Sequence, residues 1–151
     1  MAKFVFRLQT ILNYKKQIES LRKNELASAI KVFEKEKAIL RGLHFEMDQT
    51  VIKIRRLKQG QIDIVELKLL DGYCLYLKDK INAQTIVVQK AEAFVEEKKR
   101  ALVEAMRERK LLENLREKKL KEFLYEERKN EQKVSEEIFG FKYAKTLVSG
   151  E

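Results

Sequence analysis

The side chains best suited to catalysis or metal binding are too few and too scattered in this chain to form a reactive site. His44 is the only histidine and Cys74 the only cysteine, so neither a histidine-based metal cluster nor a catalytic histidine dyad can form within one chain. The carboxylates are dispersed among lysines and arginines, and no glycine-rich phosphate-binding loop occurs. We therefore expect a protein that is not an enzyme and that has no metal and no cofactor.

The lone histidine and cysteine have simpler structural interpretations. His44 is expected at the edge of a helix, and Cys74 is expected to be a small buried group between apolar neighbours. A single cysteine cannot form an internal disulfide, which fits a reducing compartment. No apolar run reaches the roughly 18 residues needed to span a bilayer, and the N-terminal residues lack the features of a signal peptide. These observations predict a cytoplasmic protein with no membrane insertion.

The composition favours long helices over a compact globule. Charged residues make up 38% of the chain and hydrophobic residues 44%, and there is no proline. Because proline interrupts helix interiors, a chain without any can continue as helix over great lengths. Abundant Lys, Glu, Leu and Arg in a regular pattern are typical of a coiled coil. The elements that position any functional residue are therefore expected to be α-helical.

Apolar residues recur at seven-residue intervals in two separate segments. The first series is Val5, Leu12, Glu19, Leu26, Phe33, Leu40, Met47 and Ile54. The second series is Leu67, Cys74, Ile81, Val88, Val95 and Leu102. In each segment a companion series lies three residues later, so both segments present the two-position seam of a coiled coil.

A short break separates the two segments and predicts a turn. Gly60 follows the last periodic residue of the first segment, and Asp63 is placed to cap the second. A connection of about five residues makes two helices antiparallel neighbours. The prediction is an all-α, single-domain antiparallel coiled-coil hairpin over residues 1–151. Its parts are helix one over about 3–58, a turn over 59–63, a longer helix two over 64–139 and a loose tail over 140–151.

The unequal arms predict an overhang and an uneven seam. Folding at the turn places residue i opposite roughly residue 122 − i, so the second helix should project beyond the first from about Lys119 to Phe139. Apolar residues in that overhang would bury against another protein or fray. Where the seam is polar, it should be weaker and its amides should exchange faster than those of Leu40–Leu57; the polar positions are Lys15, Glu19, Arg22 and Arg109.

Three aromatic residues are predicted to lie away from the seam at one height of the hairpin. Phe45 and Tyr76 occupy outward positions and Tyr73 lies on the flank beside them. Aromatic side chains are favoured anchors in protein interfaces, although single exposed apolar residues are also common. Partner binding and chance exposure both remain open for this group.

The formal net charge of +9 is concentrated near the start of the chain. Residues 1–58 contain 14 Lys and Arg against 6 Asp and Glu, whereas residues 59–95 contain 4 against 5. An acidic partner or nucleic acid could be drawn to such a segment. The basic residues are nevertheless spread around the helix with glutamates between them, so no nucleic acid is expected. A basic nucleic-acid-binding coiled coil or a homodimeric scaffold is retained as the alternative.

The opening KFVFRLQTILNYKKQIES, the bend with Gly60 and the late EEIFGFKYAK together resemble the flagellar FliJ family over nearly the whole chain. The opening KFVFRLQTILNYKKQIES is similar to the start of that family, through Phe4, Phe6, Leu8, Leu12, Lys15 and Glu19. The bend with Gly60, followed by Tyr73, Leu77 and Ile81, resembles the family's entry to its second helix. The late EEIFGFKYAK, containing Glu136, Glu137 and Ile138, resembles the family's C-terminal region.

This resemblance implies a function in protein export. The family is a small component of the flagellar type III export apparatus, with a coiled coil similar to the central stalk of rotary ATPases. Its members insert the end that bears both termini into the hexameric flagellar export ATPase. They also link that ATPase to the cytoplasmic domain of the export gate protein and handle empty substrate export chaperones. Such a protein would associate peripherally with the inner-membrane export apparatus, and a virulence secretion system could use an equivalent stalk.

The resemblance also implies two groups of partner-binding residues. The gate-binding face near the bend corresponds to Tyr73, Leu77, Lys80 and Gln84, to which the outward aromatics add Phe45 and Tyr76. The end that enters the ATPase ring is expected to use Phe4, Phe6, Arg7, Arg116, Lys119, Phe123 and Leu124.

Overall fold

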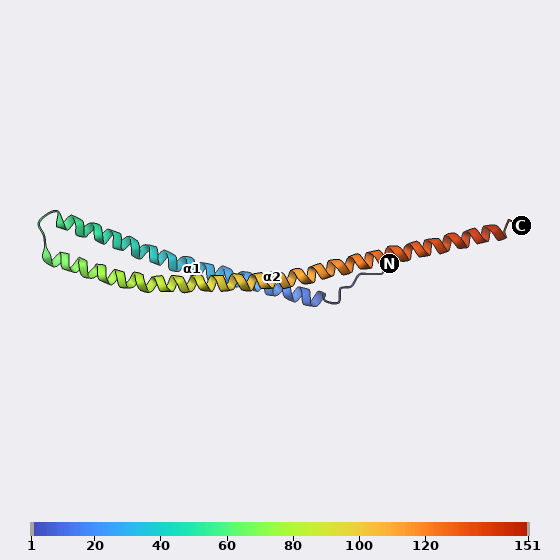
Figure 1. The fold of residues 1–151 in the computed structure, drawn as a ribbon, viewed down its shortest axis with the longest axis horizontal. Helices are drawn as coiled ribbons and strands as arrows, with labels where there is room; N and C mark the ends of the chain where they lie inside the picture. The colour runs from blue at the N-terminus through green and yellow to red at the C-terminus, as the bar shows by residue number, and fades with distance from the viewer. Residues whose placement is uncertain (1, 151) are drawn as a thin grey trace. The chain divides into compact units, whose positions relative to one another are not determined.

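Two long helices account for almost all of the chain. The computed structural model describes residues 2–150, in which α1 spans Gln9–Lys58 and α2 spans Ile64–Val148 (Figure 1). The helices contain 50 and 85 residues, and no strand occurs within the described residues. The all-α fold with a longer second helix is therefore confirmed.

The chain divides into two compact units, each of which contains part of both helices. One unit covers residues 18–105 and includes the bend; the other combines residues 1–17 with residues 106–151. A segment of one long helix packs only against the segment of the other helix opposite to it, so contacts are local. The single domain that the sequence suggested stays a prediction.

The bend in the 18–105 unit forms as the sequence predicts, but its glycine does not adopt the conformation that only glycine favours. Asp63 Oδ1 accepts hydrogen bonds from the backbone N–H groups of Val65 at 3.0 Å and Glu66 at 3.4 Å, which caps α2. Gly60 does not have a positive φ angle, and a Cβ built on it would meet nothing within 4 Å. The turn therefore does not need the conformational freedom of glycine at this position.

The antiparallel pairing in this unit follows the predicted register. Cross-helix contacts join Tyr73 to Glu46, Gln84 to Glu36 and Lys98 to Glu25. The residue numbers in these pairs sum to 119, 120 and 123, close to the predicted 122. The buried side chains lie on the predicted stripes: Glu19, Ala29, Thr50, Leu77, Val95 and Ala105. A hairpin joined by a single seam is thus the structure of residues 18–105.

The start of the other unit differs from the prediction because the first residues are not helical. Helix α1 begins at Gln9 instead of residue 3. In an extended segment, successive side chains point to opposite sides. Phe6 is accordingly buried at 9% exposure, whereas Val5, which the helical pattern placed in the seam, is exposed at 75%.

The end of the chain also differs, because α2 continues to Val148 through the region expected to be a loose tail. Gly140 lies inside the helix, where a glycine is only about 1 kcal/mol less favourable than alanine. The overhang begins later than Lys119, because Phe4 packs on Phe123. An extended segment covers more than twice the length per residue of a helix. Beyond residue 127, every described side chain is exposed.

Neither helix has a stretch apolar and long enough to cross a membrane, within the described residues.

Candidate partner-binding surfaces

Four exposed residues lie at about the same height of the 18–105 unit, and we call them the bend-end surface: Phe45, Tyr73, Tyr76 and Lys80. The rings of Tyr73 and Tyr76 stack with centroids 6.0 Å apart at 21°, and the Lys80 Nζ lies 5.5 Å from the centroid of Tyr76. Phe45 contributes the most exposed ring, at 64%. The stacking and the cation–π contact hold flat apolar rings toward solvent, which is the arrangement of an interface anchor.

A hydrogen bond between the helices fixes one ring of this surface. The Tyr73 hydroxyl donates to Glu46 Oε2 at 3.1 Å. This hydrogen bond to the carboxylate, with partial desolvation, raises the pKa of Tyr73 above its usual 10. The hydroxyl therefore stays protonated at neutral pH and keeps its role as donor, so the ring orientation is set before any partner arrives.

Two residues assigned to the gate-binding face by resemblance lie in the seam instead of on the surface. Leu77 is buried at 1% exposure, as its heptad position implies. Gln84 Nε2 donates to the backbone oxygen of Glu36 at 3.0 Å and to Glu36 Oε2 at 2.6 Å. Leu77 is thus enclosed between the paired helices, whereas Gln84 is half-buried with its amide bonded across the seam. In the described structure both side chains join α1 to α2.

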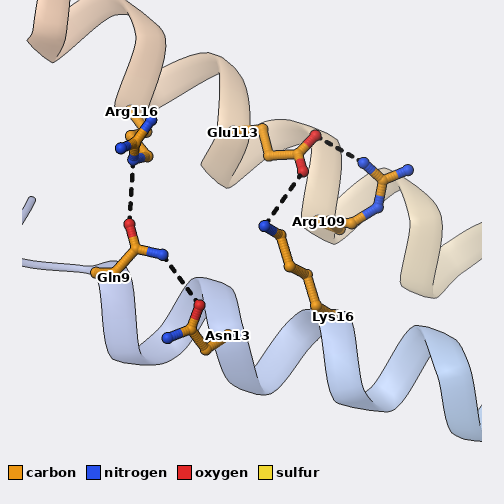
Figure 2. Close-up of polar contacts among 6 residues, drawn as sticks. All are labelled: Gln9, Asn13, Lys16, Arg109, Glu113 and Arg116. Atoms are coloured by element: carbon orange, nitrogen blue, oxygen red, sulfur yellow. Dashed lines mark hydrogen bonds and ion pairs between the residues drawn. The ribbon is translucent and has the colours of Figure 1, made fainter.

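The second surface belongs to the unit that contains both chain ends, and we call it the termini-end surface: Phe4, Phe6, Arg7, Arg116, Lys119, Phe123 and Leu124. Phe4 packs on Phe123 with ring centroids 5.6 Å apart at 50°, and the Arg116 guanidinium lies 5.7 Å from the Phe4 ring centroid. Arg116 also donates from Nε to Gln9 Oε1 at 3.1 Å (Figure 2). These contacts bring three of the seven residues, Phe4, Arg116 and Phe123, into one connected region with the helix start.

An open groove of about 640 Å³ lies along this surface. Its walls are the non-helical segment and one side of α2: residues 3–8 with Leu115, Lys119 and Phe123. Lys3, Arg7 and Lys119 are its charged residues, and no acidic residue lines it. Lys119 is already bonded to Glu122 at 2.9 Å, which lowers the pKa of that carboxyl below its usual 4.5. An apolar floor with a basic rim suits an acidic, amphipathic protein segment.

A set of polar contacts that sequence analysis missed joins α1 to α2 in the same unit. Lys15 Nζ lies 2.6 Å from Glu108 Oε2, and Lys16 Nζ lies 4.0 Å from Glu113 Oε1. Glu113 also accepts from Arg109 at 2.6 Å within α2 (Figure 2). The predicted register already placed Lys15 opposite residue 107, so the first pair could have been found by comparing charges across the seam.

The residues with catalytic potential do not converge. His44 is exposed and Cys74 is half-buried with a free thiol. Within residues 2–150, no group of three or more His, Cys, Asp or Glu side chains could hold a metal ion. The structure thus defines a class of protein: a two-helix antiparallel coiled coil with exposed aromatic side chains.

The particular family follows from comparison with known proteins. Residues 4–147 match the model of the flagellar FliJ protein family, so the chain belongs to that family and is associated with type III protein export. The match includes the helical region up to residue 147 that we had expected to be a loose tail.

A solved structure shares this fold. It is described as a YscO homologue from Chlamydia trachomatis, and it superposes with a TM-score of 0.65 at 20% sequence identity. The superposition covers 90% of this chain and 93% of the other. Comparison with curated proteins found no significant match.

Proposed function

We propose that this chain is a non-enzymatic stalk of a flagellar type III export apparatus. In this proposal the end with both termini enters the hexameric export ATPase and stimulates it, and the bend-end surface contacts the cytoplasmic domain of the export gate. Membership of the FliJ family supports the export role. The stalk works in the cytoplasm, attached peripherally to the inner-membrane apparatus, and hands on empty substrate chaperones.

The observation that carries the ATPase part of the proposal is the exposed rim of the termini-end surface. Phe4 and Phe123 hold the chain start against α2, while Arg7 lines the groove with its side chain exposed and Leu124 is exposed on α2. A ring that closed around this end would meet basic and apolar side chains whose geometry is already set. Such pre-organisation lowers the entropic cost of binding.

The observation that carries the gate part is the exposure of the stacked tyrosines. Tyr73 and Tyr76 are held by the bond to Glu46 and by Lys80, and Phe45 presents a further free ring. Because these residues belong to a different unit from the termini-end surface, the two binding activities should respond to different substitutions.

The test measures both activities on matched pairs of substitutions. We expect Phe45→Ala with Tyr76→Ala to weaken binding to the purified gate domain and to leave stimulation of the export ATPase unchanged. Arg7→Ala with Leu124→Ala should do the reverse. All four side chains are exposed, so the helical content and melting temperature should stay close to those of the wild type.

The control for the gate-binding pair is Phe94→Ala, which removes an exposed aromatic ring elsewhere on α2. It should change neither gate binding nor ATP turnover. If either pair reduced both activities in a protein that still melts normally, the assignment of separate surfaces would be wrong. If neither pair changed either activity, the stalk proposal itself would fail.

A further inference from the structure

The last three turns of α2 have an apolar face that nothing in the described structure covers. Residues 138–148 are helical and every side chain in them is exposed. Five large side chains in this segment are more than 60% exposed: Phe139, Phe141, Tyr143, Leu147 and Val148. In Figure 1 this part of α2, coloured red, has no second helix alongside it. An exposed group of this size marks an interaction site.

The apolar residues of this segment cover about 200° of the helix circumference at 3.6 residues per turn. That arc holds the five large side chains together with Gly140 and Ala144, and the polar arc holds Lys142, Lys145 and Thr146, with Ile138 between the lysines. A helix that pairs with one other helix needs only a narrow stripe at the a and d positions. The broad face of residues 138–148 is therefore suited to a flat surface.

The charge of residues 138–148 indicates what kind of flat surface this helix binds. Lys142 and Lys145 are its only charged residues, and between positions 138 and 150 there is no Asp or Glu. The preceding stretch, residues 126–137, has five acidic and three basic residues. The charge thus changes sign where the broad apolar face begins. Lysines beside phenylalanine and tyrosine form the composition of a helix that lies in a membrane interface.

We propose that residues 138–148 form an amphipathic helix that binds the surface of an anionic lipid bilayer. The apolar arc enters the boundary between headgroups and acyl chains, and the two lysines contact anionic headgroups. The helix lies on the bilayer and does not cross it. The proposed helix lies C-terminal to the residues of the gate and ATPase surfaces, which end at Leu124. Because the same end of the chain is proposed to enter the export ATPase, the helix binds lipid when the chain is not seated in the ring. It gives the chain a direct lipid contact beyond attachment through protein partners.

Flotation of the full chain with lipid vesicles tests the proposal. We expect binding to vesicles of equimolar phosphatidylglycerol and phosphatidylcholine, and much weaker binding to pure phosphatidylcholine. Each lysine near an anionic surface contributes on the order of 1 kcal/mol, so Lys142→Gln with Lys145→Gln should lower the partition coefficient about thirtyfold. The matched control removes two exposed lysines upstream on the same helix, by Lys129→Gln with Lys133→Gln, and should have little effect.

The apolar contribution is tested by Phe139→Ser with Leu147→Ser, which should reduce binding at least tenfold. The control is Leu111→Ser, an exposed leucine of the same helix, which should bind vesicles normally. All three positions are exposed, so near-normal thermal melting of the variants is expected and shows that lost binding does not come from unfolding. Stimulation of the export ATPase in lipid-free solution should persist in the Phe139→Ser, Leu147→Ser variant, which separates this inference from the proposed function.

A fluorescent probe supplies a second readout. The chain has no tryptophan, so Tyr143→Trp introduces a single one in the apolar arc. Its emission should shift to the blue with anionic vesicles. Three results would overturn the proposal: no flotation of the wild type, equal loss of binding in the upstream lysine control, or self-association without lipid that Phe139→Ser with Leu147→Ser abolishes. The last result would assign this face to a second copy of the chain.

Discussion

Replacing Leu77 by alanine tests whether this side chain stabilises the seam between the helices or binds a partner. The side chain is 1% exposed, so the substitution removes three buried carbon atoms. At about 0.8 kcal/mol for each, the free energy of unfolding should fall by about 2.5 kcal/mol. A residual cavity would add to this loss, but a seam between only two helices can close partly over the gap. The affinity for the gate domain should not change in the folded protein, because the side chain is not reachable from outside.

The measurement is urea denaturation followed by circular dichroism, with gate binding titrated well below the melting temperature. For a chain of this size, the expected loss corresponds to a decrease in melting temperature of roughly 5–10 °C. Leu75→Ala is the matched control, because the same atoms are removed from a side chain that is 63% exposed on the same helix; it should stay within about 0.5 kcal/mol of the wild type. The reasoning is refuted if both variants unfold alike, or if Leu77→Ala abolishes gate binding while the fold remains intact.

Three other perturbations test the bend, an ion pair and the seam. Gly60→Ala should raise stability by about 0.4–1 kcal/mol, because the native backbone needs no positive φ there and alanine restricts the unfolded chain; a lower urea midpoint would contradict this. The hydrogen bond from Arg22, with the charge of Lys98, lowers the pKa of Glu25 below its usual 4.5, so its stabilising effect is present above that pH and is lost as the pH falls through the lowered value. The wild type should therefore lose more melting temperature than Glu25→Gln between pH 6 and pH 3, and parallel losses would count against it. Hydrogen exchange should be faster around Glu19 than in Leu40–Leu57, and equal protection would remove the claim of a weaker polar seam.

Heptad spacing predicted the seam well because the residues that face the partner helix recur at the same seven-residue interval along the whole of a paired helix. Leu12, Leu77 and Val95 are buried where the spacing placed them, and the cross-helix pairs follow the predicted register. The same rule failed at the chain start, since it assumes helical backbone: an extended segment buried Phe6 in place of Val5. Polar hydrogen bonds across the seam depend on rotamers, which spacing does not determine.

The candidate surfaces were predictable in part. Outward heptad positions identified Phe45 and Tyr76, which are exposed, whereas the resemblance placed Leu77 and Gln84 on a face that the seam occupies. The contact between Phe4 and Phe123 could not be predicted, because helical counting underestimates how far the first residues reach. The helical tail was missed because Gly140 was interpreted as a stop, although one glycine is a weak interruption in a helix without proline.

The small number of buried positions leaves this fold free to diverge in evolution. Among the described residues only six apolar side chains are buried, so most positions can exchange one polar residue for another without loss of the fold. A structure with 20% identity can accordingly superpose over 90% of the chain. Selection on such a protein acts through spacing and surface chemistry more than through the identity of individual residues. Distant relatives should therefore be easier to recognise by the spacing of their apolar residues than by sequence alignment.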